Sequence, residues 1–162
     1  MIRAATAADA AAIADIYNHY VRDTIVTFEE EVITVAEVKW RIGEVAAIPL
    51  PWLVSVEDGV ILGYAYANRW KSRCAYRYSA ESTIYLAKNA TGRGRGTELY
   101  TALIDDLRKR GIHSVIGGVA LPNEASVALH EKLGFKKIGQ FKEVGWKFEQ
   151  WIDVGYWELM LH

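Results

Sequence analysis

The N-terminal third of the chain shows the apolar spacing of one short strand and two helices. Ile2 to Ala5 is a short apolar stretch, and Thr6 with Asp9 three residues later has the pattern that opens a helix. Thr34 with Glu37 repeats that pattern before a second helix, which Pro49 and Pro51 end. The apolar stripes are Ile13, Ile16, Tyr17 and Tyr20 in the first helix, and Val35, Val38, Ile42, Val45 and Ala46 in the second. Residues 21–33 between them are expected to form a loop or a broken helix.

From Trp52 the pattern changes to that of strands. The segments WLVSVE and VILGYAYANRW are rich in β-branched and aromatic residues and flank Asp58-Gly59, so they predict a hairpin. A basic and aromatic stretch, WKSRCAYRY, separates this hairpin from a further strand, TIYLA, at Thr83 to Ala87.

The second half of the chain alternates between strand and helix patterns. A glycine-rich turn, TGRGRGT, leads into a helix with Leu99, Leu103, Ile104 and Leu107, which ends at Gly111. The segment SVIGGVAL then predicts a buried strand, NEASVALHEKLG a helix, and residues 136–144 and 154–161 two extended segments. We therefore expect one mixed α/β domain that spans residues 1–162.

Composition narrows the class of protein and its partners. The chain has 162 residues, of which 51% are hydrophobic and 24% charged, values typical of a folded globular protein. Nineteen basic residues against twenty acidic ones leave a net charge of -1, so we expect neither nucleic acid nor a membrane as partner. Cys74 is the only cysteine, and no run of about 18 apolar residues is present. These features favour a cytoplasmic protein.

The glycine-rich turn before the third helix is a candidate phosphate site. Gly92, Gly94 and Gly96 allow backbone conformations that other residues resist, and they lie where a helix exposes unpaired N–H groups. Arg93, Arg95 and Lys88 add positive charge beside the positive end of the helix dipole. The turn matches neither the Walker A nor the Rossmann pattern, and a plain tight turn is the alternative.

Glu81 is a candidate general base. It lies just before the predicted strand that leads into the glycine turn, and it precedes the apolar residues Ile84 and Leu86. Partial burial there would raise its pKa from about 4.3 toward the value that a general base needs. A solvated charge at a strand end is the alternative.

Two further groups of residues are candidates for chemistry. The stretch from Arg69 to Tyr78 carries cations and tyrosines suited to binding an anionic group, although a solvated loop would have the same composition. His130 lies on the last helix and is either structural or catalytic. The remaining histidines have no partners at metal-ligand spacing, so no metal is expected, and Cys74 lacks the neighbours of a nucleophile.

The order of these motifs resembles the GNAT superfamily of N-acetyltransferases. The resemblance rests on the segments WKSRCAY, AESTIYL, GRGRGTELYTALI, LPNEASVALHEKLGF and WIDVGYW, together with IYNHYV and VTF nearer the N-terminus. Within the superfamily they are most similar to the phosphinothricin N-acetyltransferases. The resemblance covers almost the whole chain and implies a mixed, mostly antiparallel sheet, flanked by helices and splayed at the strand around Ile84 to Leu86.

The resemblance also implies roles for individual residues. It assigns acetyl-CoA to Ile84, Tyr85, Leu86, Gly92, Arg93, Gly94, Arg95, Gly96, Thr97 and Asn123, and the amine substrate to Phe28, Lys71, Arg73 and Tyr76. It implies that Glu81 is the general base. Thr91 stands where the superfamily usually has Gln or Arg, which would weaken side-chain support of the phosphates. His130 stands where many members have a tyrosine that acts as general acid, so His130 is a candidate acid or a substrate contact.

The activity implied is transfer of an acetyl group from acetyl-CoA to the amine of phosphinothricin or a similar amino-acid analogue, by a homodimeric enzyme without a metal. A methionine sulfoximine or methionine sulfone acetyltransferase is the alternative among enzymes. A non-catalytic CoA-binding module is the alternative of another class, and binding of nucleic acid by GRGRG is disfavoured by the charge balance.

Overall fold

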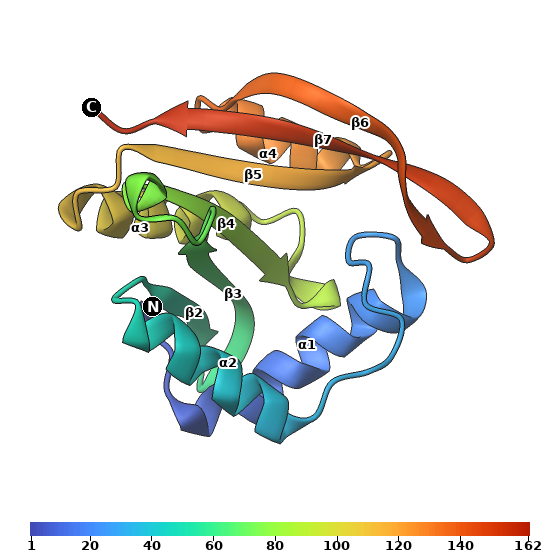
Figure 1. Ribbon diagram of the computed structural model, residues 1–162. Coiled ribbons are helices and arrows are strands. Elements are labelled where there is room, and N and C mark those ends of the chain that lie inside the picture. Colours follow the sequence, from blue (N-terminus) through green and yellow to red (C-terminus); the bar gives the residue numbers. More distant parts are fainter.

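A seven-stranded sheet runs through the molecule in the order β1-β2-β3-β4-β5-β7-β6 (Figure 1). The computed structural model describes all residues from 1 to 162. The strands are β1 (Ile2–Ala4), β2 (Trp52–Glu57), β3 (Val60–Arg69), β4 (Ser79–Leu86), β5 (Ser114–Leu121), β6 (Lys136–Lys147) and β7 (Gln150–Met160). Only β4 and β5 pair in parallel, so the sheet is mixed and mostly antiparallel, as the resemblance implies.

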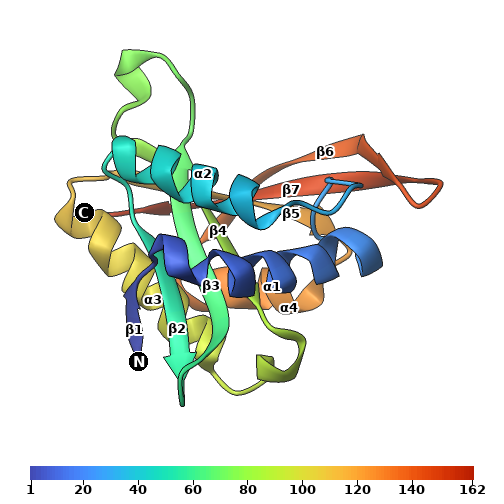
Figure 2. The ribbon, with the colours of Figure 1, turned by 90° about the horizontal axis from the view of Figure 1, so that it is seen from below.

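Helices cover both faces of this sheet. The helices α1 (Ala10–Asp23) and α2 (Val35–Ala47) lie on one face, and α3 (Arg95–Lys109) and α4 (Glu124–Lys132) lie on the other (Figure 2). Three short 3-10 turns, η1 (Ala7–Asp9), η2 (Cys74–Tyr76) and η3 (Lys88–Ala90), complete the elements. No helix is long and apolar enough to cross a membrane.

The two predicted helix starts form by the expected hydrogen bonds. The Thr6 N–H donates to the Asp9 carboxylate at 2.7 Å, but this pair encloses the turn η1, and α1 begins only at Ala10. The Thr34 hydroxyl accepts the Glu37 N–H at 3.1 Å and caps α2. The expected loop at 21–33 is shorter than predicted, because α1 continues through Asp23.

The C-terminal strands differ most from the prediction. The two expected extended segments are one long hairpin, in which β6 and β7 are joined by Phe148 and Glu149. Both turn residues have left-handed backbone angles, with φ of 52° and 57°. Such turns usually contain glycine or asparagine, so these residues carry no sequence signal for the hairpin.

β4 and β5 part after a short paired region. Their pairing is confined to Ser79–Glu81 against Ser114–Ile116, and beyond these residues the strands diverge. The sheet is therefore splayed along the second half of β4, as expected. β4 itself begins at Ser79, so the expectation that Glu81 lies before the strand is wrong, and Glu81 is part of the strand where the opening begins.

The core consists of two clusters, one on each face of the sheet. One includes Leu99, Tyr100, Leu103 and Leu107 of α3, packed with Trp157 of β7. The other joins α1 and α2 to the aromatic residues of β2 and β3, including Trp52 and Tyr64. The first cluster also contains Ala80 of β4 and Val115 of β5, so the core on that face continues across the place where these two strands part.

Candidate active site

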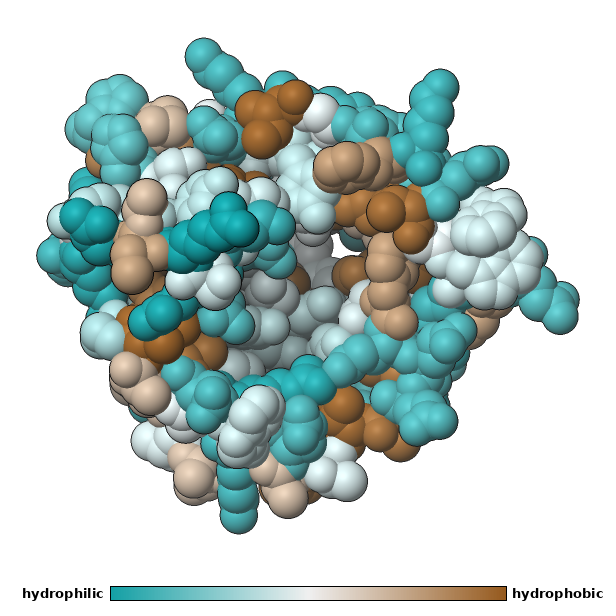
Figure 3. All heavy atoms as spheres, viewed as in Figure 1, coloured by the Kyte–Doolittle hydropathy of each residue, from teal (hydrophilic) through white to brown (hydrophobic).

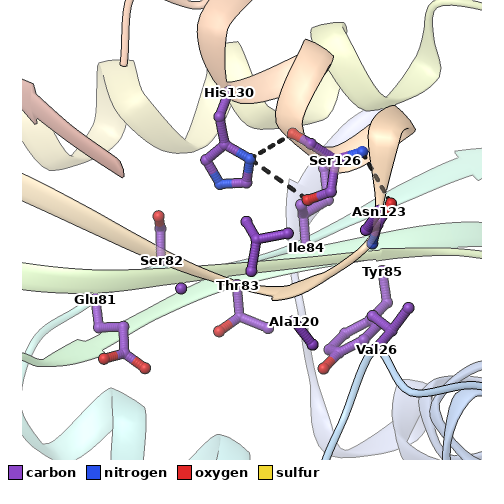
Figure 4. A pocket seen from close by; sticks show the side chains of 12 residues that line it. Val26, Glu81, Ser82, Thr83, Ile84, Tyr85, Ala120, Asn123, Ser126 and His130 are labelled. Carbon is purple, nitrogen blue, oxygen red and sulfur yellow. Dashed lines mark hydrogen bonds between the residues drawn. The ribbon is translucent and has the colours of Figure 1, made fainter. Parts of the chain in front are cut away.

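The parting of β4 and β5 leaves a cavity of about 180 Å³. The space-filling view shows the molecule hollowed near its centre, between the part that contains β5 to β7 and the part that contains α1 and α2 (Figure 3). The cavity lies among β4, β5 and the start of α4 (Figure 4). Its lining is Val26, Glu81, Ser82, Thr83, Ile84, Tyr85, Gly118, Val119, Ala120, Asn123, Ser126 and His130.

The edge of β4 that faces this cavity carries free backbone groups. In an antiparallel pair, alternate residues direct their N–H and C=O groups to the same neighbour. The Ala87 N–H donates to the Leu62 carbonyl of β3, so by this alternation the N–H groups of Ile84 and Leu86 point the other way, into the opening. These two residues can therefore hydrogen-bond an extended amide-containing chain laid beside β4.

The glycine turn forms an anion site at the start of α3. Gly94 is the N-cap, with φ of 76°, and no side chain caps this helix end. The first N–H groups of the helix have no carbonyl one turn earlier to accept them, and Glu98 N–H is the first to find one, on Gly94. Arg95, Gly96 and Thr97 thus offer backbone donors at the positive end of the helix dipole, a fit for a pyrophosphate.

The side chains around the glycine turn differ in whether they are already paired or remain free to bind an anion. The Arg95 guanidinium donates to the Glu57 carboxylate at 2.5 Å, so its charge is already paired. The Thr91 hydroxyl donates to the Lys88 carbonyl at 3.3 Å. Arg93 is exposed and available. Lys132 of α4 donates to the Thr97 hydroxyl at 3.4 Å, which places an ammonium beside the turn that the sequence did not indicate.

The end of β4 and the glycine turn lie against each other. A Cβ atom on Gly96 would stand 3.4 Å from Cδ1 of Leu86 and 3.5 Å from Cδ2 of Leu129. The structure therefore brings the predicted cofactor residues on β4 and on the turn into one surface. Asn123 belongs to it as well, because it lines the cavity while its Oδ1 accepts the Ser126 N–H at 3.1 Å and caps α4.

Glu81 lies where the cavity meets a second one, of about 400 Å³. The second cavity is lined by Val26, Phe28, Glu81, Gly118, Ala120, Phe141, Val144, Val154 and Tyr156. Burial raises the pKa of Glu81 above its ordinary value, and the nearby Lys71 ammonium lowers it in part. A half-buried carboxylate with a raised pKa, reached from two cavities, has the properties of a general base.

The second cavity is lined mainly by apolar side chains, and Glu81 is the only charged residue among them. Phe28 reaches it from the loop between α1 and α2, Phe141 and Val144 from β6, and Tyr156 from β7. No Lys or Arg contributes to its lining. Of the predicted substrate residues, Phe28 lines this cavity, and a lining without a cation suits an uncharged side chain of a substrate.

The other predicted substrate residues lie outside both cavities. Lys71, Arg73 and Tyr76 are exposed on the loop that joins β3 to β4. Lys71 stacks on Trp70 at 4.9 Å, and the Trp70 ring meets Tyr156 edge-on with centroids 5.8 Å apart. Lys71 is thus linked to the mouth of the second cavity, whereas neither Arg73 nor Tyr76 is among the lining residues.

His130 belongs to a buried hydrogen-bond network. Its Nδ1 lies 2.7 Å from the Ser126 carbonyl, which can only accept, so Nδ1 carries the proton. Burial lowers the pKa of His130, which favours the neutral ring, and Nε2 then accepts the Tyr100 hydroxyl at 3.0 Å. The Ser82 hydroxyl lies 2.5 Å from the Tyr100 hydroxyl and completes the network. Neither ring nitrogen presents a free proton to the cavity, and His130 is absent from the second cavity.

Glu81 and His130 lie on opposite faces of β4 (Figure 4). Side chains alternate along a strand, so Glu81 shares a face with Tyr85, which packs on Tyr17 of α1, while Ser82 points toward Tyr100 of α3. The two residues therefore do not form a pair. Sequence reasoning missed the partners Ser82, Tyr100 and Ser126. Ser126 lies one helical turn before His130, whereas no local pattern links Ser82 and Tyr100 to it.

The chain is similar to known proteins along nearly its whole length. A family model described as an acetyltransferase (GNAT) domain matches residues 2–155. A phosphinothricin N-acetyltransferase of Streptomyces viridochromogenes is 42% identical over 159 residues, covering 97% of this chain and 85% of the relative. An L-methionine sulfoximine/L-methionine sulfone acetyltransferase of Salmonella typhimurium is 37% identical over 161 residues, covering 99% and 94%.

The fold also matches that of solved structures. The structure of a Salmonella typhimurium protein, solved with its cofactor acetyl-CoA, superimposes with a TM-score of 0.97 at 36% identity, covering 100% of this chain and 94% of that one. With a splayed sheet, an uncapped glycine turn and matching relatives along nearly its whole length, the chain belongs to the GNAT family and is an acetyl-CoA-dependent N-acetyltransferase.

Proposed function

We propose that the protein acetylates the amino group of phosphinothricin or a similar small amino-acid analogue, with acetyl-CoA as donor and Glu81 as general base. One observation carries this proposal: two cavities meet at Glu81, one between β4, β5 and the start of α4, and the other the pocket beside Phe28. Two reactants held in such cavities meet at the carboxylate, which removes much of the entropic barrier.

The donor side of the reaction uses mainly backbone groups. N–H groups at the start of α3 would hold the pyrophosphate, and those of Ile84 and Leu86 the pantetheine arm. An N–H of the parted strand can also stabilise the negative charge that grows on the thioester oxygen. Arg93 and Lys132 would add positive charge near the phosphates, whereas the charge of Arg95 is paired with that of Glu57.

On the acceptor side Glu81 would accept the proton of the incoming ammonium, directly or through water. The free amine then attacks the thioester carbon, the C–N bond forms, and the C–S bond breaks to release CoA as thiolate. The extra proton that remains on the new amide nitrogen passes to solvent. His130 holds its protons within the network of Ser126 and Tyr100. We therefore assign His130 to shaping the cavity and not to protonating the thiolate.

A second candidate substrate has a specific observation in its favour. Methionine sulfoximine and methionine sulfone have side chains without the negative charge of a phosphinate, and the pocket beside Phe28 contains no cation. Burying an unpaired anion there would be costly. Lys71 at the pocket mouth remains free to meet the α-carboxylate that all these substrates share.

The protein is also proposed to act as a cytoplasmic homodimer. The β6–β7 hairpin exposes Phe141, Trp146, Phe148 and Trp151, each at least half exposed. Exposed aromatic groups at this density are typical of protein interfaces. Light scattering behind a size-exclusion column measures the oligomeric state, and a monomer at micromolar concentration would contradict this part of the proposal.

The activity is tested by thiol release from acetyl-CoA with a panel of amines. The panel contains phosphinothricin, methionine sulfone, methionine sulfoximine and, as a matched control without a free amine, N-acetylmethionine sulfone. We expect release with at least one free amine and none with the control. If the absence of a cation from the pocket determines the preference, kcat/KM is higher for the sulfone than for phosphinothricin. Binding of CoA without release from any amine would favour a non-catalytic module.

A further inference from the structure

Lys147 is a buried cation that the reaction does not use. It is the last residue of β6, directly before the hairpin turn, and its side chain is among the most completely buried in the protein, with 2% exposure. A lysine is seldom buried to this extent without a specific partner, because removing its charge from water is costly. A specific hydrogen-bond partner is therefore expected for its ammonium group.

The partner of Lys147 is the loop between α1 and α2. Its Nζ donates to the Thr27 carbonyl at 2.8 Å, across 120 residues of sequence. Thr27 is itself buried, and its hydroxyl pairs with the Tyr17 hydroxyl of α1 at 2.7 Å. The loop is thus fastened on one side to α1 and on the other side to β6.

A second contact fastens the same loop two residues earlier on β6. Gly145 is buried, and a Cβ atom built on it would overlap the ring of Phe28. The Phe28 ring therefore occupies the space that a side chain at 145 would fill. Lys147 and Gly145 together hold the segment Val26–Phe28 against β6, one by a hydrogen bond and one by leaving room.

This segment forms a wall of the apolar pocket. Val26 and Phe28 line it from the loop, and Phe141 and Val144 line it from β6, whereas neither Lys147 nor Gly145 reaches it. The distance between the two walls is consequently set by the contacts behind them. We propose that Lys147, with Gly145, is a positioning residue that fixes the width of the acceptor pocket by clamping the α1–α2 loop to β6.

The charge of Lys147 is compatible with this role. The carboxylates of Glu29 and Glu30, which follow Phe28 on the same loop, act on the ammonium and partly oppose the lowering of its pKa by burial. Glu29 is in turn held by Arg41 of α2 at 2.5 Å. The loop therefore brings its own counter-charges to the buried lysine, so loop and strand stabilise each other.

The test compares Lys147→Met with Lys142→Met, a change of an exposed lysine on the same strand. Methionine keeps an unbranched side chain, one heavy atom shorter than lysine, and has no hydrogen-bond donor. In Lys147→Met we expect backbone amides of residues 24–30 to exchange hydrogen about tenfold faster or more, while Lys142→Met leaves them unchanged. We also expect the amine KM to rise about fivefold or more and the acetyl-CoA KM to stay within twofold. Lys147→Arg, which keeps a cationic donor, should restore much of the loss.

Gly145→Ala tests the same clamp without removing a charge. Its methyl group must displace the Phe28 ring, so it should change the amine KM and leave the acetyl-CoA KM alone, even if Lys147→Met does not fold. The kinetic arm rests on the proposed function, but the exchange arm does not: unchanged exchange at 24–30 in folded Lys147→Met overturns the clamp whatever the substrate. Equal rises of both KM values would show a merely structural role and also overturn it.

Discussion

The Nε2 atom of His130 lies 3.0 Å from the hydroxyl of Tyr100, in an interior where both side chains are almost completely buried. The Tyr100 hydroxyl in turn meets Ser82 of β4, next to Glu81. A Cβ atom on Gly117 would stand 2.5 Å from the same Nε2, so β5 leaves room for the ring only because it has glycine there. The network therefore joins α3, α4 and β4 behind the donor cavity.

Protonation of His130 should weaken the fold. Burial lowers the pKa of His130 below the value of about 6.5 that it has in the unfolded chain, so the unfolded state binds the extra proton more readily. Above about pH 6.5 the neutral ring makes its full contribution to the free energy of unfolding. That free energy should fall as the pH drops below this value toward the lower pKa of the folded state. Urea titrations from pH 7.5 to 5 measure this slope, and His130→Gln should have a shallower one; equal slopes would contradict it.

Removing the Tyr100 hydroxyl should cost stability. In Tyr100→Phe, Nε2 of His130 loses its donor and the Ser82 hydroxyl loses its partner, both in buried surroundings. An unsatisfied buried polar group costs about 1–3 kcal/mol. Tyr78→Phe, at an exposed position, is the control and should change the free energy of unfolding by less than about 0.5 kcal/mol. A loss of stability in Tyr100→Phe as small as in the control would show that the network does not stabilise the fold.

Gly94 offers a test of the donor site against a matched glycine. Gly94 and Gly59 both have left-handed backbones, with φ of 76° and 77°, and neither has an atom near the place of a Cβ. Substitution by alanine should therefore cost similar stability at both positions, about 1 kcal/mol. Only Gly94→Ala should also raise the acetyl-CoA KM, because only Gly94 is the N-cap of α3, beside the proposed phosphate site. Equal KM values in the two variants would place the phosphates elsewhere.

Lys71 should tune the pH at which the enzyme becomes active. Its ammonium lowers the pKa of Glu81, against the raising effect of burial. In Lys71→Met this opposition is lost, so the acidic limb of the kcat/KM profile should move to higher pH. Arg77→Met removes a cation from the same loop that has no recorded effect on Glu81, and its limb should not move. A shift toward lower pH, or equal shifts in both variants, would contradict this.

Features of the site that depend on local sequence were predictable, and those that depend on distant contacts were not. The glycine turn, the strand SVIGGVAL and the helix after Asn123 formed where the pattern placed them, since caps, glycines and apolar spacing act over a few residues. Lys147 gave no signal, because lysine normally indicates a solvated position. Its burial results from a partner at Thr27 that no local pattern reveals.

For the loop from 70 to 78, the sequence predicted the kinds of side chain but not the directions in which they point. Its composition indicated cations for an anionic ligand, and Lys71 does lie near Glu81. Which of the remaining side chains face the cavity depends on the path of the loop, which turns through η2 and leaves Arg73 and Tyr76 exposed. Their role in substrate binding stays a prediction, and Arg73→Ala should raise the amine KM more than the acetyl-CoA KM if it is right.

The most direct test of the central claim is the turnover of Glu81→Gln with both substrates saturating. Glutamine keeps the size of the side chain but does not accept a proton at neutral pH, so kcat should fall by about 10²–10⁴-fold while the acetyl-CoA KM stays within twofold. A folded Glu81→Gln protein that turns over within about threefold of the unaltered enzyme would show that another group removes the proton from the amine.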